Sequence, residues 1–160
     1  MANRIVEQKL VDTNKKTIVK YVIIADGTTQ ESNTRLLDAS SLSFALNANG
    51  VISQSGLKSN YRTSIKKIKA FGKLAGTIRL KWEGDANSEI IVFGSGGIDY
   101  GAEGEGVLIN NPEANATGDI LISTVGMGTG DAITMFLELK KDNADYDAGQ
   151  TADPYAFNRA

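Results

Sequence analysis

The sequence contains neither cysteine nor histidine among its 160 residues. Without cysteine the chain can form no disulfide and has no thiol nucleophile. Without histidine it lacks the commonest general base and the commonest zinc ligand, so a triad of serine, histidine and aspartate is excluded within it. We therefore expect a protein that is not an enzyme and that binds no metal or other cofactor.

Long apolar segments are also missing. No run approaches the roughly 18 residues that a membrane-spanning helix needs. Residues 1–7 have neither the apolar region nor the cleavage pattern of a secretion signal. We expect a soluble protein that does not bind membranes. A length of 160 residues suits one domain with its own core.

Acidic residues are absent between Asp38 and Glu83, a stretch that holds eight lysines and arginines. From Glu83 onward fourteen carboxylates stand against three basic residues, although the whole chain has a net charge of only −2. Charge separated in this way can pair with the surface of a neighbouring molecule. The predicted partner-binding residues of this basic face are Arg62, Lys66, Lys69, Arg79 and Lys81.

Three interpretations of the basic stretch are open. It can meet an acidic surface of another subunit, it can be a solvated face, or it can bind the phosphates of nucleic acid. The acidic remainder of the chain would repel nucleic acid, and we expect the interleaved aromatic residues Phe71 and Trp82 to pack in the core. We therefore favour contact with another protein and expect no nucleic acid.

Apolar residues recur mostly with a period of two, which predicts strands. Residues 77–82 and 132–140 alternate most cleanly. A short strand followed by a helical turn, opened by Asp38 or Ser40, is expected within 34–46. The remaining strands are predicted at 5–11, 16–26, 62–71, 89–93, 106–110 and 119–125, with a loop or loop-rich hairpin at 94–106.

About eight short strands separated by turn residues indicate an all-β fold, a single β-sandwich for which a jelly roll is one topology. We expect this domain to cover residues 1–141. Its core should contain the inward residues of the two cleanest strands, which are Ile78, Leu80, Trp82, Ile133, Met135, Leu137 and Leu139.

Residues 142–160 show neither strand nor helix periodicity, yet they contain the aromatic residues Tyr146, Tyr155 and Phe157. The segment is either a flexible terminus or an arm that inserts these rings into pockets of a neighbour. We favour an extended C-terminal arm, because disordered tails are usually poor in aromatic residues and Pro154 favours an extended course.

Other local patterns have simpler explanations. The glycines between 94 and 106 are followed by no Gly-Lys-Ser/Thr sequence and no helix pattern, so a nucleotide site is not expected. Asp99, Glu103 and Glu105 match no calcium-binding spacing and are interpreted as a solvated loop. Glu83 and Asp85 occupy a turn, where acidic residues and glycine are common.

Three stretches resemble small virion proteins encoded by tailed bacteriophages. They are residues 81–90 (KWEGDANSEI), 111–121 (NPEANATGDIL) and 146–158 (YDAGQTADPYAFN), and the likeness extends over most of the chain. The resemblance implies a virion component, and small β-rich proteins of this size in phages often clamp the outer surface of the shell. It therefore implies a capsid decoration (cement) protein on the phage head, with the major capsid protein or another virion protein as partner.

Two classes of function stay open at this point. The first is a structural virion protein, expected to be a homo-oligomer, with head decoration ahead of a tail, neck or baseplate part. The second is a carbohydrate- or cell-surface-binding module, which only the analogy of the β-sandwich fold supports.

Overall fold

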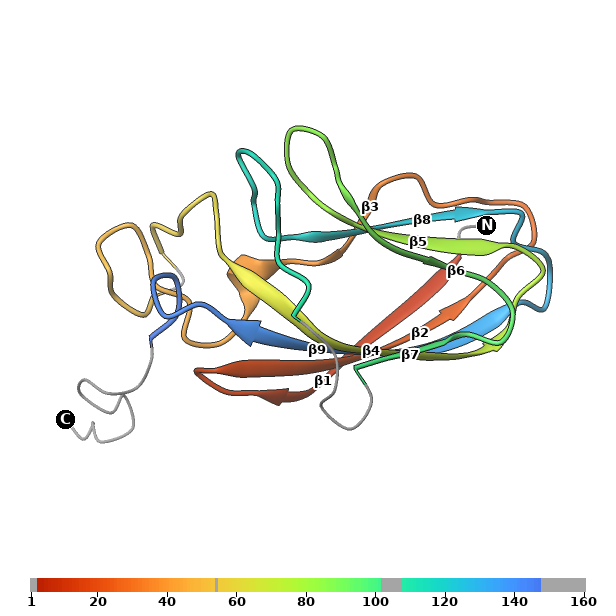
Figure 1. Cartoon of the computed structure of the whole chain (residues 1–160), viewed down its shortest axis with the longest axis horizontal. Helices are drawn as coiled ribbons and strands as arrows, with labels where there is room; N and C mark the ends of the chain where they lie inside the picture. The colour runs from red at the N-terminus through yellow and green to blue at the C-terminus, as the bar shows by residue number, and fades with distance from the viewer. Residues whose placement is uncertain (1–2, 54, 102–107, 148–160) are drawn as a thin grey trace.

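Two antiparallel β-sheets, packed face to face, make up the computed structural model (Figure 1). The structure describes residues 3–53, 55–101 and 108–147. Its elements are β1 (Arg4–Asp12), β2 (Lys16–Ile24), β3 (Thr34–Leu37), the 3-10 helix η1 (Ala39–Ser41), β4 (Thr63–Lys73), β5 (Thr77–Trp82), β6 (Glu89–Phe93), β7 (Ile98–Tyr100), β8 (Ile120–Val125) and β9 (Ala132–Lys141). The predicted all-β sandwich is confirmed.

The strand order is that of a jelly roll. One sheet has the order β1-β2-β9-β4-β7 and the other β3-β8-β5-β6. From β2 to β9 the first strand pairs with the last and the pairing continues inward, as β2 with β9, β3 with β8, β4 with β7 and β5 with β6. Alternate pairs lie in opposite sheets, which is the arrangement of an eight-stranded jelly roll. Strand β1 lies outside the roll and is joined to β2 by a hairpin.

The core lies between the sheets and follows from alternation along the strands, since successive side chains of a strand point to opposite faces. Trp82 is 1% exposed and the other inward residues of β5 and β9 are equally buried. These residues are Ile78, Leu80, Ile133, Met135, Leu137 and Leu139, as predicted.

The expected strand and helical turn within 34–46 are present as β3 and η1. Asp38 caps η1 by accepting a hydrogen bond from the Ser40 backbone N–H at 3.0 Å, which satisfies a donor that has no partner inside the helix.

Two other predicted elements differ. Residues 98–100 form β7 inside the expected loop-rich hairpin. Of the expected strand at 106–110, residues 106 and 107 lie outside the described residues, and Ile109 forms only an isolated bridge with Ile65.

Candidate interaction surfaces

The basic residues predicted to form one face lie on both outer sides of the sandwich. Lys66 and Lys69 belong to β4 of the five-stranded sheet, whereas Arg79 and Lys81 belong to β5 of the four-stranded sheet. Because the sheets pack face to face, their outward side chains point in opposite directions. The prediction of a single basic face is therefore wrong. The acid-free stretch crosses from one sheet to the other between β4 and β5, and no sequence pattern marks that crossing.

On the four-stranded side the predicted residues have partners within the chain. Arg79 forms an ion pair with Glu89 on the neighbouring strand β6. Lys81 Nζ donates a hydrogen bond to Asn33 Oδ1 at 3.0 Å. Their positive charge is therefore partly satisfied in the isolated domain.

Arg62 precedes β4 and binds the segment that follows β9. Its Nε atom lies 3.0 Å from Asp145 Oδ2, and its backbone N–H donates to the same oxygen at 2.8 Å. The hydrogen bond and the charge of Asp145 raise the pKa of Arg62 above its usual value. Arg62 thus helps to hold the segment that follows β9, a role that the sequence did not indicate.

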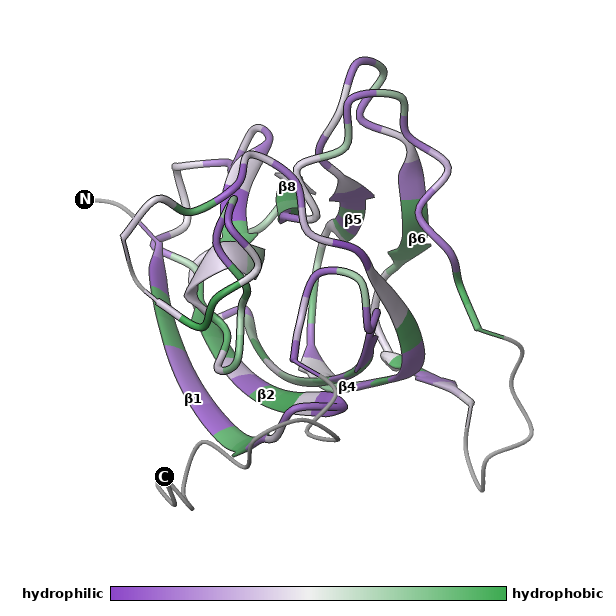
Figure 2. Ribbon diagram, turned by 90° about the vertical axis from the view of Figure 1, so that its left-hand side faces the viewer, coloured by the Kyte–Doolittle hydropathy of each residue, from purple (hydrophilic) through white to green (hydrophobic). Residues whose placement is uncertain are grey.

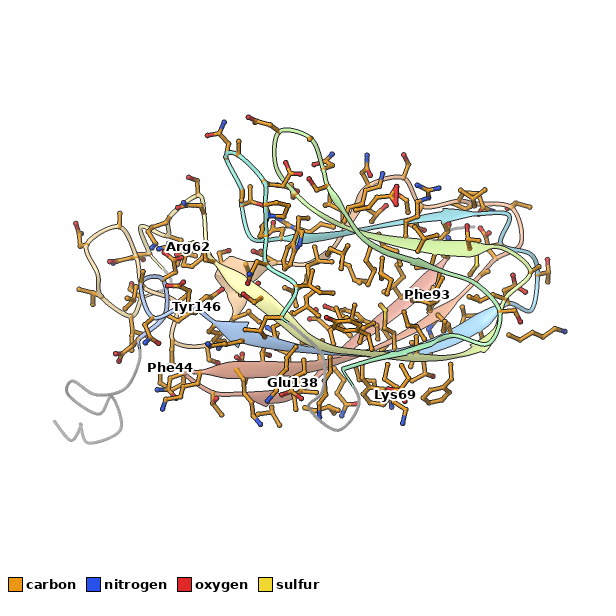
Figure 3. The ribbon with its side chains drawn as sticks, viewed as in Figure 1. Phe44, Arg62, Lys69, Phe93, Glu138 and Tyr146 are labelled. Carbon is orange, nitrogen blue, oxygen red and sulfur yellow. The ribbon has the colours of Figure 1, made fainter. Side chains whose placement is uncertain are left out.

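The outer surface of the five-stranded sheet combines lysines with apolar side chains, and we name it the basic-apolar face. The strand register places Arg4, Ile24, Ala132 and Lys73 in one row. Two further rows contain Val6, Val22, Thr134 and Phe71, and Gln8, Lys20, Phe136, Lys69 and Asp99. Beyond them lie Ile18, Glu138 and Lys67, and then Lys16 and Lys140. Figure 3 shows Lys69 and Glu138 pointing away from the other sheet.

The apolar part of this face centres on Phe71, which the sequence analysis wrongly placed in the core. Phe71 is 51% exposed and stacks on Phe136, with ring centroids 6.3 Å apart. Ile68 and Ala70 point into the core, so alternation puts Phe71 outside. The alternation is visible in the sequence, but the prediction relied on the hydrophobic character of the Phe71 ring instead. Val6 and Ile24 extend the exposed apolar surface.

Lysines gather around one carboxylate at the other end of the face. A β-bulge between Ile65 and Lys67 places Lys66 beside Glu138, with Lys66 Nζ 3.7 Å from Glu138 Oε2. The two residues line a groove of about 420 Å³ together with Lys15, Lys16, Leu108, Leu139 and Lys140. Four ammonium groups against one carboxylate leave an excess of positive charge, which favours an anionic partner.

Tyr146, predicted to anchor an arm in a neighbour, is instead fully buried in its own domain. Its hydroxyl donates a hydrogen bond to the Ala39 carbonyl at 2.8 Å, and its ring lies 5.5 Å from that of Tyr61. A ring held in this way cannot enter a pocket of another subunit, so the prediction is wrong for Tyr146. The folded domain includes residues 142–147, which turn back and bond to residues 44–46 and to Arg62.

Two buried charges hold this returning segment. Asp145 binds Lys58 as well as Arg62. Burial alone raises the pKa of Asp145, but the hydrogen bonds from these two cations outweigh it and keep the pKa below its usual value. The Lys141 side chain is 0% exposed. Its Nζ atom lies 2.6 Å from Asp12 Oδ1 and 5.1 Å from the centre of the Tyr146 ring. Burial lowers the pKa of Lys141 against the opposing effect of Asp12.

Tyr155 and Phe157, the other predicted anchors, lie outside the described residues. Within the part of the chain that the structure describes, no group of three or more acidic side chains is arranged to hold a metal ion. No helix among those residues is long and apolar enough to cross a membrane.

Comparison with known proteins places the chain in no family. No family model matches it, and a search of curated proteins finds no match. Among solved structures it is similar to a chain from the study "Insight into Three-dimensional structure of Maize Chlorotic Mottle Virus Revealed by Single Particle Analysis", with 7% identity and a TM-score of 0.23 over 95% of this chain and 98% of that chain. A TM-score this low carries no argument about function.

Proposed function

We propose that this protein is a structural virion component that decorates and stabilises a bacteriophage capsid on the head surface, with its basic-apolar face against an acidic surface of the shell. The proposed role is binding rather than catalysis. The major capsid protein is the proposed partner, and neither nucleic acid nor a membrane takes part.

The composition of the basic-apolar face carries this proposal. Exposed apolar side chains such as Phe71 and Val6 can be buried against a partner, and the surrounding lysines select a partner that carries carboxylates. The jelly roll is a fold used by viral capsid proteins, but also by lectins and cupins, so the fold supports the proposal only by analogy.

Attachment of many copies needs no strong single contact. Several weak contacts made at once raise the overall affinity well above that of each one. A sheet surface suits such contacts because the strands already fix the backbone, so little backbone entropy is lost on binding.

The split of the basic residues between opposite outer surfaces gives a sharp test. In one variant Lys20 and Lys69, which flank Phe136 on the basic-apolar face, are both changed to Glu. In the matched control Arg79 and Lys81, on the opposite side, are both changed to Glu. Rebinding to particles stripped of the native protein should fall for the first variant and change much less for the second. Equal retention of both variants would contradict the proposed face.

Two further measurements complete the test. Binding should weaken with added salt, because charges are screened over about 10 Å at 0.1 M ionic strength. Purified virions should contain the protein in numbers comparable with the shell protein. A few copies per particle would indicate a neck or tail part instead, and complete absence would overturn the virion role.

A further inference from the structure

Strand β1 is an exposed edge of the five-stranded sheet. It has nine residues, compared with three, four and five in the other edge strands β7, β3 and β6. Its one neighbour in the described sheets is β2, and Figure 2 shows it as the outermost strand of its layer. The free N–H and C=O groups of a long edge strand can pair with another strand.

The sequence of β1 is complementary to itself when two copies run antiparallel. With Gln8 opposite Gln8 of a second copy, Glu7 lies opposite Lys9 and Val6 lies opposite Leu10. By the twofold symmetry each of these pairs occurs twice. Opposite charges and apolar side chains that face one another across an antiparallel pair are the combinations that stabilise it.

The observed geometry is consistent with this register over the three residues from Glu7 to Lys9. Directly opposite residues must point to the same side of the sheet. Val6 points to the outer side, opposite Val22, and is 43% exposed. Glu7 and Lys9 both point to the inner side, where Glu7 accepts a hydrogen bond from Tyr21 and Lys9 lies 3.4 Å from the Ser41 carbonyl oxygen. Leu10 lies in a β-bulge between Lys9 and Val11, so residues 10–12 are left out of the regular match.

We infer that two copies of this chain associate through their β1 strands about a twofold axis at Gln8, joining the two five-stranded sheets into one continuous sheet. The axis is perpendicular to the sheet, so both basic-apolar faces point the same way. Association of this kind would occur in the purified protein, whether or not the protein attaches to a particle.

Charge reversal tests the register in the full-length chain. Glu7→Lys places two lysines opposite one another at both symmetric positions, and Lys9→Glu does the same with two glutamates. Each variant alone should bind itself at least about tenfold more weakly than the native chain, measured by sedimentation equilibrium. A one-to-one mixture of the two variants restores opposite charges at every pair and should form dimers, as should the double variant.

Because the chain has no cysteine, a single introduced cysteine allows a second test by disulfide cross-linking. Directly opposite Cβ atoms of an antiparallel pair lie about 4.5–5.5 Å apart, close to the roughly 3.5–4.5 Å of a disulfide. Gln8→Cys should therefore give a disulfide-linked dimer rapidly under mild oxidation. Val125→Cys, a 60% exposed position on the other sheet, should do so only slowly.

Circular dichroism and thermal melting would show that each variant is folded. Asp99→Lys makes the same charge change as Glu7→Lys but lies away from β1, so it should dimerise as the native chain does. The inference would be overturned if the native chain stayed monomeric or if the single charge variants dimerised normally. It would also be overturned if the mixture formed no dimers or if the two cysteine variants oxidised at equal rates.

Discussion

Asp145 is the residue whose surroundings differ most from what the sequence indicates. In the sequence it belongs to the polar, aperiodic segment that begins at residue 142. In the structure it is a buried carboxylate that accepts hydrogen bonds from Lys58 and Arg62. The pairing joins positions more than 80 residues apart, so no local pattern could have revealed it.

We expect Asp145→Asn to lower the free energy of unfolding by about 2–3 kcal/mol at neutral pH, because it leaves Lys58 and Arg62 without their carboxylate. The loss is no larger because the Arg62 side chain is largely exposed and solvent screens its charge. The effect should depend on pH. The folded pKa of Asp145 lies below its unfolded value of 3.8, so its contribution is present above about pH 4 and is lost as the pH falls through the folded pKa.

Urea unfolding of both proteins from pH 7 to pH 2 would measure this contribution. The difference between the native chain and Asp145→Asn should shrink below pH 4. A difference that is the same at every pH would show that the charge of Asp145 is not what stabilises the segment.

A second prediction at this scale compares two aromatic residues. Trp82→Ala should cost roughly 3–5 kcal/mol of stability, because the indole is buried between the sheets. Phe71→Ala should cost much less, about 1 kcal/mol, since half of the Phe71 side chain is already exposed. Chemical denaturation of the two variants gives both values, and similar losses would contradict the assignment of Phe71 to the outer surface.

At the scale of elements, strands with strict alternation were predictable and elements that depend on a distant partner were not. In β5 and β9 every second residue is large and apolar, so position and orientation could both be predicted. Strand β7 has three residues, and its existence depends on pairing with β4. Alternation also shows which side chains point outward but not which sheet a strand joins, and for this reason Lys69 and Arg79 were wrongly assigned to one face.

Two truncations of the chain would test whether residues 142–147 belong to the domain. A chain that ends after Asp147 keeps the contacts of Asp145 and Tyr146, so we expect its melting temperature to stay close to that of the full chain. A chain that ends after Lys141 loses both residues and leaves the space of a buried tyrosine. It should lose about 3 kcal/mol or more of stability.

Thermal melting followed by circular dichroism would compare the two truncations with the full chain. Equal and large losses in both would place part of the core beyond Asp147. No loss in either would mean that the burial of Tyr146 contributes nothing to stability.

At the scale of the whole molecule, the two outer surfaces differ in character. On the four-stranded side, the ion pair of Arg79 with Glu89 and the hydrogen bond of Lys81 to Asn33 use charge within the domain. On the five-stranded side, the lysines outnumber the carboxylates of Asp99 and Glu138. The net charge of the chain, −2, conceals this difference. The charge balance of each surface depends on which sheet each strand joins.

The position of β9 has a consequence for how the chain folds. It is the last of the described strands in chain order, yet it lies in the middle of its sheet, between β2 and β4. An emerging polypeptide that stops before Ala132 has the outer parts of that sheet but nothing to join them. Closure must therefore wait for the last strand, and contacts between such distant segments form slowly, on a scale of milliseconds to seconds in β-rich domains. During that interval the inner surfaces of β2 and β4 stay exposed to non-native contacts, so synthesis in a crowded cell should favour early capture by chaperones.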